Sequence, residues 1–328
     1  MRLLTDAPEA ARAFAAPGAT WRPVVAGALD PRLHRAWRVL AGPAAPWVSD
    51  DGSVASGESP PKALLVLGRA EGSQFEALRT ALRDGDGLPD ALASLALTGS
   101  GFRGQRGRAW AALPGNLHLC VLERIDGPAA ALQAALTALP AVATARAIER
   151  LSEGRVRPAV KWVNDLLVAG AKVAGVLTAT QVQGARVTHA LFGIGVNVAR
   201  APELAADARA PRPGCLADAA PDLHDALPAL TRAILDEVDG ALSTLRAGDG
   251  TAIVASYRER ASFVGRRVAI WPVTDLDQAV TAPLARGRVS ALLDDLALRL
   301  EGHPDPIRSG RMTLLDDDAA PAAEDGCP

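Results

Sequence analysis

Apolar residues run along this chain in short groups, some with the two-residue repeat of strands and some with helical spacing. Over residues 1–41 the pattern predicts a short β-α-β-α unit. Asp6 with Glu9 three residues later is a capping-box pattern, and Asp30 followed by proline predicts a second helix start. Residues 42–62 are rich in Pro, Gly, Ser and Asp, which is typical of a loop or linker.

The middle of the chain predicts an α/β region. Short apolar runs predict strands at residues 63–68, 93–98, 116–122, 159–162, 166–168, 172–178 and 187–196. Helical patterns cover residues 73–82, 127–145 and 227–246. The second of these is uncharged and long enough to raise the question of a membrane span, but it is rich in Ala, Gln and Thr and contains Pro140. We therefore interpret it as a buried helix.

From about residue 264 the pattern changes to short alternating strands separated by turns. These segments (RRVAIW, GRVSAL, LALRLE and IRSGRMTLL) predict a small β-barrel, and the last ten residues are typical of a disordered tail. The chain is thus predicted to be α+β. The expected division is an N-terminal α/β extension and linker (1–62), a catalytic domain (63–255), a C-terminal β domain (256–318) and a tail (319–328).

Composition and charge limit the function only slightly. The net charge of −2 gives no overall attraction to nucleic acid or to an anionic membrane, so any anion site must be local. Cys120, Cys215 and Cys327 are widely spaced, which fits neither a disulfide framework nor a CxxC metal pair and indicates a reducing cytoplasm. The N-terminal residues carry charges where an export signal needs an apolar core.

A loop rich in arginine and glycine is the first candidate for chemistry. It reads FRGQRGR over residues 102–108 and comes before Trp110 and a predicted strand. Glycine allows backbone N–H groups to approach an anion, and each guanidinium can bind a phosphate or carboxylate through two hydrogen bonds. The alternatives are a solvated basic loop or a nucleic-acid contact.

A second candidate is the sequence KWVND with the lysine that follows it. Lys161, Asn164 and Asp165 lie at a strand end, and Lys172 opens the next strand. A hairpin would bring these groups together, which suits nucleotide chemistry: a carboxylate for a metal or sugar hydroxyl, and lysines for phosphate charge. The alternative is a turn with exposed lysines.

Two weaker signals complete the set. Gly193 and Gly195 lie in a hydrophobic strand that ends in Asn197, and glycine in a strand indicates a bulge or the close approach of a ligand. Ser73 with Glu76 forms a capping box, and the same helix N-terminus could also receive a carboxylate.

Taken together and in this order, the segments FRGQRGRAW…PGNL, KWVND, KVAG and GIGVN resemble the biotin protein ligases of the biotin/lipoate protein ligase family. The resemblance covers roughly residues 63–200 and, more loosely, the C-terminal β-module. It implies a class II synthetase-like mixed sheet with helices and a C-terminal SH3-like barrel. It also implies a reaction in which biotin and ATP, with Mg²⁺, form biotinyl-5′-AMP, and biotin then passes to a lysine of an acceptor protein of the biotin carboxyl carrier type.

The resemblance also assigns roles to residues. The catalytic residues would be Lys172, Lys161 and Asp165, with Asp165 also at the metal. Biotin would contact Ser73, Arg103, Gly104, Gly175, Gly193 and Gly195. ATP and the adenylate would contact Gln105, Arg106, Gly107, Arg108, Trp110, Asn164 and Asn197.

The chain departs from the family pattern at several positions. Phe102 replaces a glycine, Gln105 replaces an arginine and Val163 replaces a proline. A polar residue is missing at Gly99, and Arg311 reverses a charge in the C-terminal module. These changes bear on the choice of acid and on retention of the intermediate.

Three alternatives follow from the sequence. Lipoate or octanoate is the nearest rival acid, and a non-catalytic binding module of the same fold is a second alternative. Acyl transfer without ATP is a third, which would need an activated thiol or lysine, and Cys120 and Cys215 lie in a strand and a loop without a placed His partner. We expect no nucleic-acid partner, because residues 1–60 lack a winged-helix pattern, and no membrane; a homodimer is a hypothesis only.

Overall fold

The computed structural model describes residues 2–25, 27–49, 63–204, 207, 209–272 and 282–315, without the side chain of Arg106. Part of the predicted linker (50–62) and the predicted tail (319–328) lie outside these residues.

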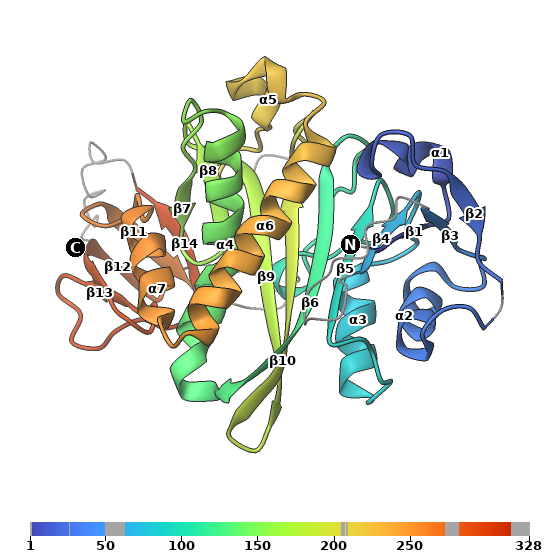
Figure 1. Ribbon diagram of the computed structural model, residues 1–328. Coiled ribbons are helices and arrows are strands. Elements are labelled where there is room, and N and C mark those ends of the chain that lie inside the picture. Colours follow the sequence, from blue (N-terminus) through green and yellow to red (C-terminus); the bar gives the residue numbers. More distant parts are fainter. Residues whose placement is uncertain are drawn as a thin grey trace.

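A single mixed sheet holds most of the described strands (Figure 1). They are β1 (Arg2–Thr5), β2 (Trp21–Pro23), β3 (Trp47–Ser49), β4 (Ala63–Leu67), β5 (Ala91–Ala96), β6 (Leu117–Pro128), β7 (Ala159–Lys161), β8 (Asp165–Val168), β9 (Ala171–Gln183) and β10 (Arg186–Val196). Their order is β2-β3-β1-β4-β5-β6-β10-β9-β8-β7. Strands β1, β4 and β5 pair in parallel, whereas the other pairs are antiparallel. The predicted mixed α/β architecture is confirmed.

Helices cover both faces of this sheet (Figure 1). They are α1 (Pro8–Ala11), α2 (Pro31–Ala41), α3 (Gln74–Arg83), α4 (Ala129–Leu151), α5 (Leu216–Ala219), α6 (Leu227–Arg246) and α7 (Gly250–Glu259). One face packs against α4 and α6, and the other packs against α2 and α3. Burial on both sides explains why every residue of β4 is apolar and buried.

The N-terminal segment belongs to the main sheet, and two details of its prediction are wrong. Strand β3 lies inside the segment predicted to be a loop, because it pairs with both β1 and β2. The capping box does not form: α1 has no side-chain cap, and Asp6 Oδ1 instead accepts a hydrogen bond of 2.7 Å from the N–H of Gly68. Asp30 does cap α2, accepting from the N–H groups of Arg32 and Leu33.

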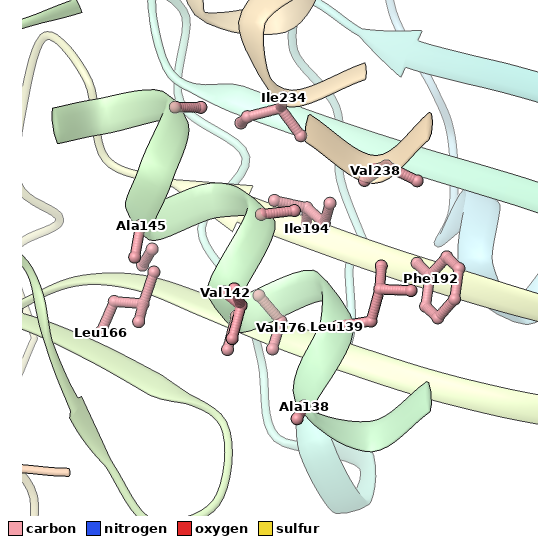
Figure 2. Packing of buried hydrophobic residues seen from close by; sticks show 14 of the residues in the cluster. Ala138, Leu139, Val142, Ala145, Leu166, Val176, Phe192, Ile194, Ile234 and Val238 are labelled. Carbon is pink, nitrogen blue, oxygen red and sulfur yellow. The ribbon is translucent and has the colours of Figure 1, made fainter. Parts of the chain in front are cut away.

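Helix α4 is the central element of the larger core. Figure 2 shows Leu139 and Val142 of this helix packing towards Val176 and Phe192 of the sheet, with Ile234 of α6 beside them. In the described part of the chain it is the one helix long and apolar enough to span a membrane, but 67% of its most apolar window is buried. It is a core helix.

Pro140 lies inside α4 without leaving a buried carbonyl unpaired. Proline has no N–H, so the carbonyl of Leu136 loses its helical partner. Thr178 Oγ1 of β9 donates to that carbonyl at 3.2 Å. The neighbouring strand therefore replaces the hydrogen bond that the helix cannot make.

The C-terminal module is an antiparallel sheet of β11 (Arg267–Trp271), β12 (Ala285–Leu292), β13 (Leu298–Leu300) and β14 (Arg311–Leu314), in the order β13-β12-β11-β14. The four predicted strand segments are confirmed; α7, which precedes them, was not predicted. The indole N–H of Trp162 donates to the carbonyl of Leu296 at 2.8 Å, which ties this sheet to the loop between β7 and β8.

Candidate active site

A row of five directly paired residues crosses the sheet on the face that carries α3. Lys161, Asp165, Gly175, Gly195 and His118 lie on β7, β8, β9, β10 and β6, and each is paired with the next. Side chains of directly opposed residues lie on the same face of a sheet. Two glycines thus form a floor, with charged groups on one side and an imidazole on the other.

The charged side of this row is a lysine–aspartate–lysine cluster. Asp165 Oδ1 lies 2.5 Å from Lys172 Nζ, and Oδ2 lies 3.5 Å from Lys161 Nζ. Burial alone would raise the pKa of Asp165, but the charges of Lys172 and Lys161 outweigh burial and lower it. Burial lowers the pKa of Lys161 despite the nearby carboxylate. Asp165 is therefore an anion that holds two cations, and the Lys172 side chain is 25% exposed.

Lys172 reaches a cavity of about 810 Å³ above the glycine floor. The predicted site residues that line this cavity are Ser73, Arg103, Gly104, Gln105, Arg108, Trp110, Asn164, Lys172, Gly175, Gly193, Gly195 and Asn197. Residues from the arginine-rich loop, from the N-terminus of α3, from strands β9 and β10 and from the segments beside them are thus brought together. Lys161 and Asp165 lie behind Lys172, and Gly107 belongs to the loop without lining the cavity.

The arginine-rich loop is folded back on itself beside the cavity. Residues Arg103 and Ala109 form an isolated bridge, and the N–H of Gly104 donates to the carbonyl of Arg108 at 2.7 Å. Arg103 donates to the carbonyl of Gly107, and the charge of Arg108 helps to lower the pKa of Asp165. The predicted cationic loop is therefore placed against the acid–lysine cluster. The side chain of Arg106 lies outside the described part of the structure.

Gly193 and Gly195 have no room for a side chain because aromatic rings lie against them. A Cβ at Gly195 would lie 2.5 Å from the ring of Trp110, and a Cβ at Gly193 would lie 2.9 Å from the ring of Phe75. A Cβ at Gly175 would make only ordinary contacts, at 3.4 Å, with Trp110 and Lys172. Trp110 also places its ring 5.9 Å from Lys172 Nζ, so one indole spans the floor and touches the catalytic candidate.

His118 is a site residue that no sequence motif revealed. Its Nδ1 accepts from the indole N–H of Trp110 at 3.2 Å, and its Nε2 lies 3.2 Å from the carbonyl of Leu113. Burial lowers the pKa of His118 to about 4, so the ring is neutral and holds Trp110 in place. Cys120 lacks an activating base, and burial raises the pKa of its thiol to about 12, which contradicts acyl transfer through this residue.

The two asparagines fasten the backbone around the site. Asn164 Nδ2 donates to the carbonyl of Val176, and the backbone carbonyl of Asn164 accepts from the N–H of Val176. Asn197 Nδ2 donates to the carbonyl of Gly214, which holds the segment after β10 beside Lys172.

Residues far along the chain complete the cationic lining. Arg212 and Arg311 line the cavity together with Asp207, whose carboxylate pairs with Arg311 at 2.6 Å. Arg212 lies in a loop without a motif, so no sequence signal pointed to it. Among the described residues there is no group of three or more His, Cys, Asp or Glu side chains that could hold a metal ion.

Comparison with known proteins assigns the middle of the chain to a protein family. Residues 86–197 match the biotin/lipoate A/B protein ligase family. This segment is a domain of that family. It contains the arginine-rich loop, the lysine–aspartate–lysine cluster and the glycine floor.

Named relatives of this ligase-family domain are biotin ligases. The chain is 37% identical over 149 residues to a biotin–[acetyl-CoA-carboxylase] ligase of Paracoccus denitrificans, covering 45% of this chain and 58% of that protein. It is 31% identical over 175 residues to the ligase of the same name from Mycobacterium tuberculosis, covering 51% and 60%. The chain thus matches less than two thirds of the length of either relative.

Solved structures show the same fold. A biotin protein ligase from Aquifex aeolicus, in complex with biotin and ATP, superposes with a TM-score of 0.57 at 19% identity and covers 77% of this chain and 98% of its own. At this identity the similarity shows only the fold of the ligase-family domain and the segments around it.

Proposed function

We propose that this protein is an ATP-dependent biotin protein ligase that forms biotinyl-5′-AMP and transfers biotin to a lysine of an acceptor protein. The observation that carries the proposal is the Lys161–Asp165–Lys172 cluster at the edge of a glycine-floored cavity with a cationic lining. The named relatives are biotin ligases, which supports biotin as the acid.

The first step joins two anions, and the cavity supplies the charge to offset their repulsion. A carboxylate oxygen of the acid attacks the α-phosphorus of ATP, and pyrophosphate leaves. Lys172, with Arg103, Arg108, Arg212 and Arg311 around the same cavity, stabilises the negative charge that develops at the α-phosphate. Asp165 binds Lys172 Nζ and so holds this side chain beside the cavity.

The second step is attack on the mixed anhydride. The amine nitrogen of the acceptor lysine forms a bond to the acyl carbon, AMP leaves with the electron pair of the broken C–O bond, and the nitrogen loses a proton. The folded arginine loop and Trp110 close one side of the cavity, which limits access of water to the reactive acyl group.

Asp165, which lies behind Lys172, is the carboxylate that we propose as the metal contact. Magnesium is often held by one or two carboxylates together with substrate phosphates, and when bound it would neutralise phosphate charge. One carboxylate is consistent with this pattern, although both of its oxygens face lysines. We expect Asp165→Asn to raise the Mg²⁺ concentration needed for half-maximal activity, and an unchanged requirement would remove the assignment.

Lipoate or octanoate remains a second candidate acid. The observation that favours it is the apolar end of the cavity, which is lined by Phe75, Phe102, Cys120 and Leu177. A saturated chain would fit such a lining without unpaired polar groups.

The wider assignments are part of the same proposal. The acceptor would be a domain of the biotin carboxyl carrier type, the protein would act in the cytoplasm without nucleic acid, and a homodimer is a hypothesis. The C-terminal antiparallel sheet would belong to an SH3-like barrel that forms a domain of its own over residues 256–318, after a catalytic domain over 63–255. Arg311 of that sheet lies at the cavity, which gives the module a place in the site.

Exchange of pyrophosphate into ATP, with biotin, lipoate and octanoate supplied separately, tests the proposal. Exchange with biotin, followed by labelling of a biotin carrier domain, is the expected result. Exchange with another acid alone would keep the mechanism and change the substrate. Absence of exchange in folded protein would favour a non-catalytic module of the same fold.

A further inference from the structure

The cavity has two ends of different chemistry, and Trp110 lies between them. Its ring contacts Lys172 on one side and its indole N–H binds His118 on the other. The end near Lys172 is cationic, whereas the other end is lined by Phe75, Phe102 and neighbouring apolar side chains. A carboxylic acid that places its carboxylate at Lys172 would therefore place its body at the apolar end.

Polar side chains at the apolar end are already engaged within the protein. Gln74 is 2% exposed; its Nε2 donates to the carbonyl of His118 and its Oε1 accepts from Ser94. Both ring nitrogens of His118 face protein partners, as described above. Selection of the acid body at this end must therefore depend mainly on shape.

Phe102 is a wall residue whose ring and backbone both have partners within the protein. Its ring meets His118 edge-on, with centroids 5.5 Å apart, and its side chain is 8% exposed. Its carbonyl accepts from the backbone N–H of Trp110 at 3.0 Å, so the backbone at Phe102 is joined to the backbone of Trp110. A ring confined on these sides cannot turn away to admit a wider ligand without moving its neighbours.

Gly99 and Phe102 form one unit. A Cβ at Gly99 would lie 2.5 Å from Phe102 Cε2 and 2.4 Å from the carbonyl oxygen of Ala70. Position 99 can carry no side chain while Phe102 and Ala70 keep these places. The ring of Phe102 thus fills the space that a side chain at position 99 would need. This one ring therefore forms the part of the cavity wall that side chains at positions 99 and 102 could otherwise share.

We propose that Phe102, seated on Gly99, is the specificity-determining residue that selects the body of the carboxylic acid by its shape. This inference rests on the proposed function, because it assumes that a carboxylic acid binds with its carboxylate at Lys172. Removal of the ring loses contacts with the preferred acid and opens room for acids that otherwise fit poorly.

The test compares wild-type protein, Phe102→Ala and Phe102→Leu with Val182→Ala, a control in which an apolar side chain, 48% exposed and remote from the cavity lining, is trimmed. Octanoate, lipoate and biotin are the probes. Pyrophosphate exchange gives kcat/KM for each acid, calorimetry gives each dissociation constant, and thermal melting checks folding. Phe102→Leu serves if the alanine variant does not fold.

We expect the ratio of kcat/KM between the preferred acid and the next best to fall at least tenfold in Phe102→Ala, with the KM for ATP within twofold of wild type. Val182→Ala should leave the ratio unchanged. A folded Phe102 variant that keeps the wild-type ratio, in exchange and in binding, would overturn the role of Phe102 alone. Wild-type protein that neither binds nor activates any of the three acids would overturn the proposed function and this inference with it.

Discussion

At the scale of single residues, the site depends on buried charge and on one neutral imidazole. Asp165 is 7% exposed and is bound by two lysines, of which Lys172 faces the cavity. A buried carboxylate is tolerated only when such partners and hydrogen bonds offset its desolvation. The ion pair with Asp165 therefore fixes the position of Lys172 beside the cavity.

Replacement of Lys172 by alanine should strongly slow adenylate formation. The side chain supplies a cation where charge develops, and loss of one such group typically lowers the rate by a factor of about 10² to 10³. Pyrophosphate exchange measures the loss, and thermal melting measures the fold. A folded Lys172→Ala protein with wild-type exchange would contradict the assignment.

Stability should depend on pH through His118. Its pKa is about 4 in the folded protein against a usual value of 6.5, so the unfolded chain binds the proton first as pH falls. The contribution of the neutral ring to the free energy of unfolding is complete above pH 6.5. It decreases as the pH falls towards 4, by up to about 3 kcal/mol.

Denaturant unfolding of wild-type protein and His118→Asn between pH 4 and pH 7 measures this effect. The asparagine variant should lack this part of the pH dependence, because its amide does not titrate in the range. His34→Asn, at an exposed position on α2, is the matched control and should keep the wild-type slope. Equal slopes in wild type and His118→Asn would show that His118 does not titrate as described.

At the scale of elements, the strands decide which side chains meet. Direct pairing of β7, β8, β9, β10 and β6 aligns a charge cluster, two glycines and an imidazole in one row. Alternation along β9 and β10 then sends the neighbouring apolar residues, such as Val176 and Ile194, to the opposite face and the α4 core (Figure 2). The same strands thus serve the core and the cavity.

Substitution of Gly195 by alanine should displace Trp110. The added Cβ would lie 2.5 Å from the indole, and such crowding costs about 1–3 kcal/mol of stability. We expect kcat/KM for the acid to fall at least tenfold. Gly240→Ala is the control: it lies in α6 with no atom within 4 Å of a new Cβ, and it should raise stability by up to about 1 kcal/mol. Wild-type kinetics in Gly195→Ala would show that the indole can move without consequence.

At the scale of the whole molecule, the N-terminal segment and the C-terminal sheet each share a hydrophobic core with the main sheet and its helices. Val268, Ile270 and Leu298 of the C-terminal sheet belong to the same core cluster as α4 and α6. Leu4 and Trp37 of the N-terminal segment belong to the cluster that includes Phe75 and Phe102 at the cavity. Neither end of the described chain is independent of the site.

Substitution of Trp162 by phenylalanine should loosen the C-terminal sheet. It removes the hydrogen bond to Leu296 and leaves a buried carbonyl unpaired, at a cost of about 1–3 kcal/mol. Hydrogen exchange should accelerate in β12 and β13. Trp21→Phe is the control, because the indole N–H of Trp21 is buried without a partner among the described residues, so its loss should be nearly neutral. Equal protection in both variants would contradict this role for Trp162.

The sequence by itself determined the elements and most of the candidate site. Apolar periodicity located the strands from β4 to β10 and helices α3, α4 and α6, because burial on a pleated or helical face leaves a local repeat. The motifs identified Lys161, Asp165, Lys172, the arginine loop and the glycines, because each is a short segment whose chemistry is visible in order along the chain.

Only the tertiary structure decided which of these groups touch. The pairing of β3 with β1, the hold of His118 on Trp110 and the fit of Phe102 over Gly99 join residues through register and packing. Arg212 and Arg311 reach the cavity from segments that share no local pattern with it. Such contacts depend on how distant strands align, and a one-residue shift would send each side chain to the other face of the sheet.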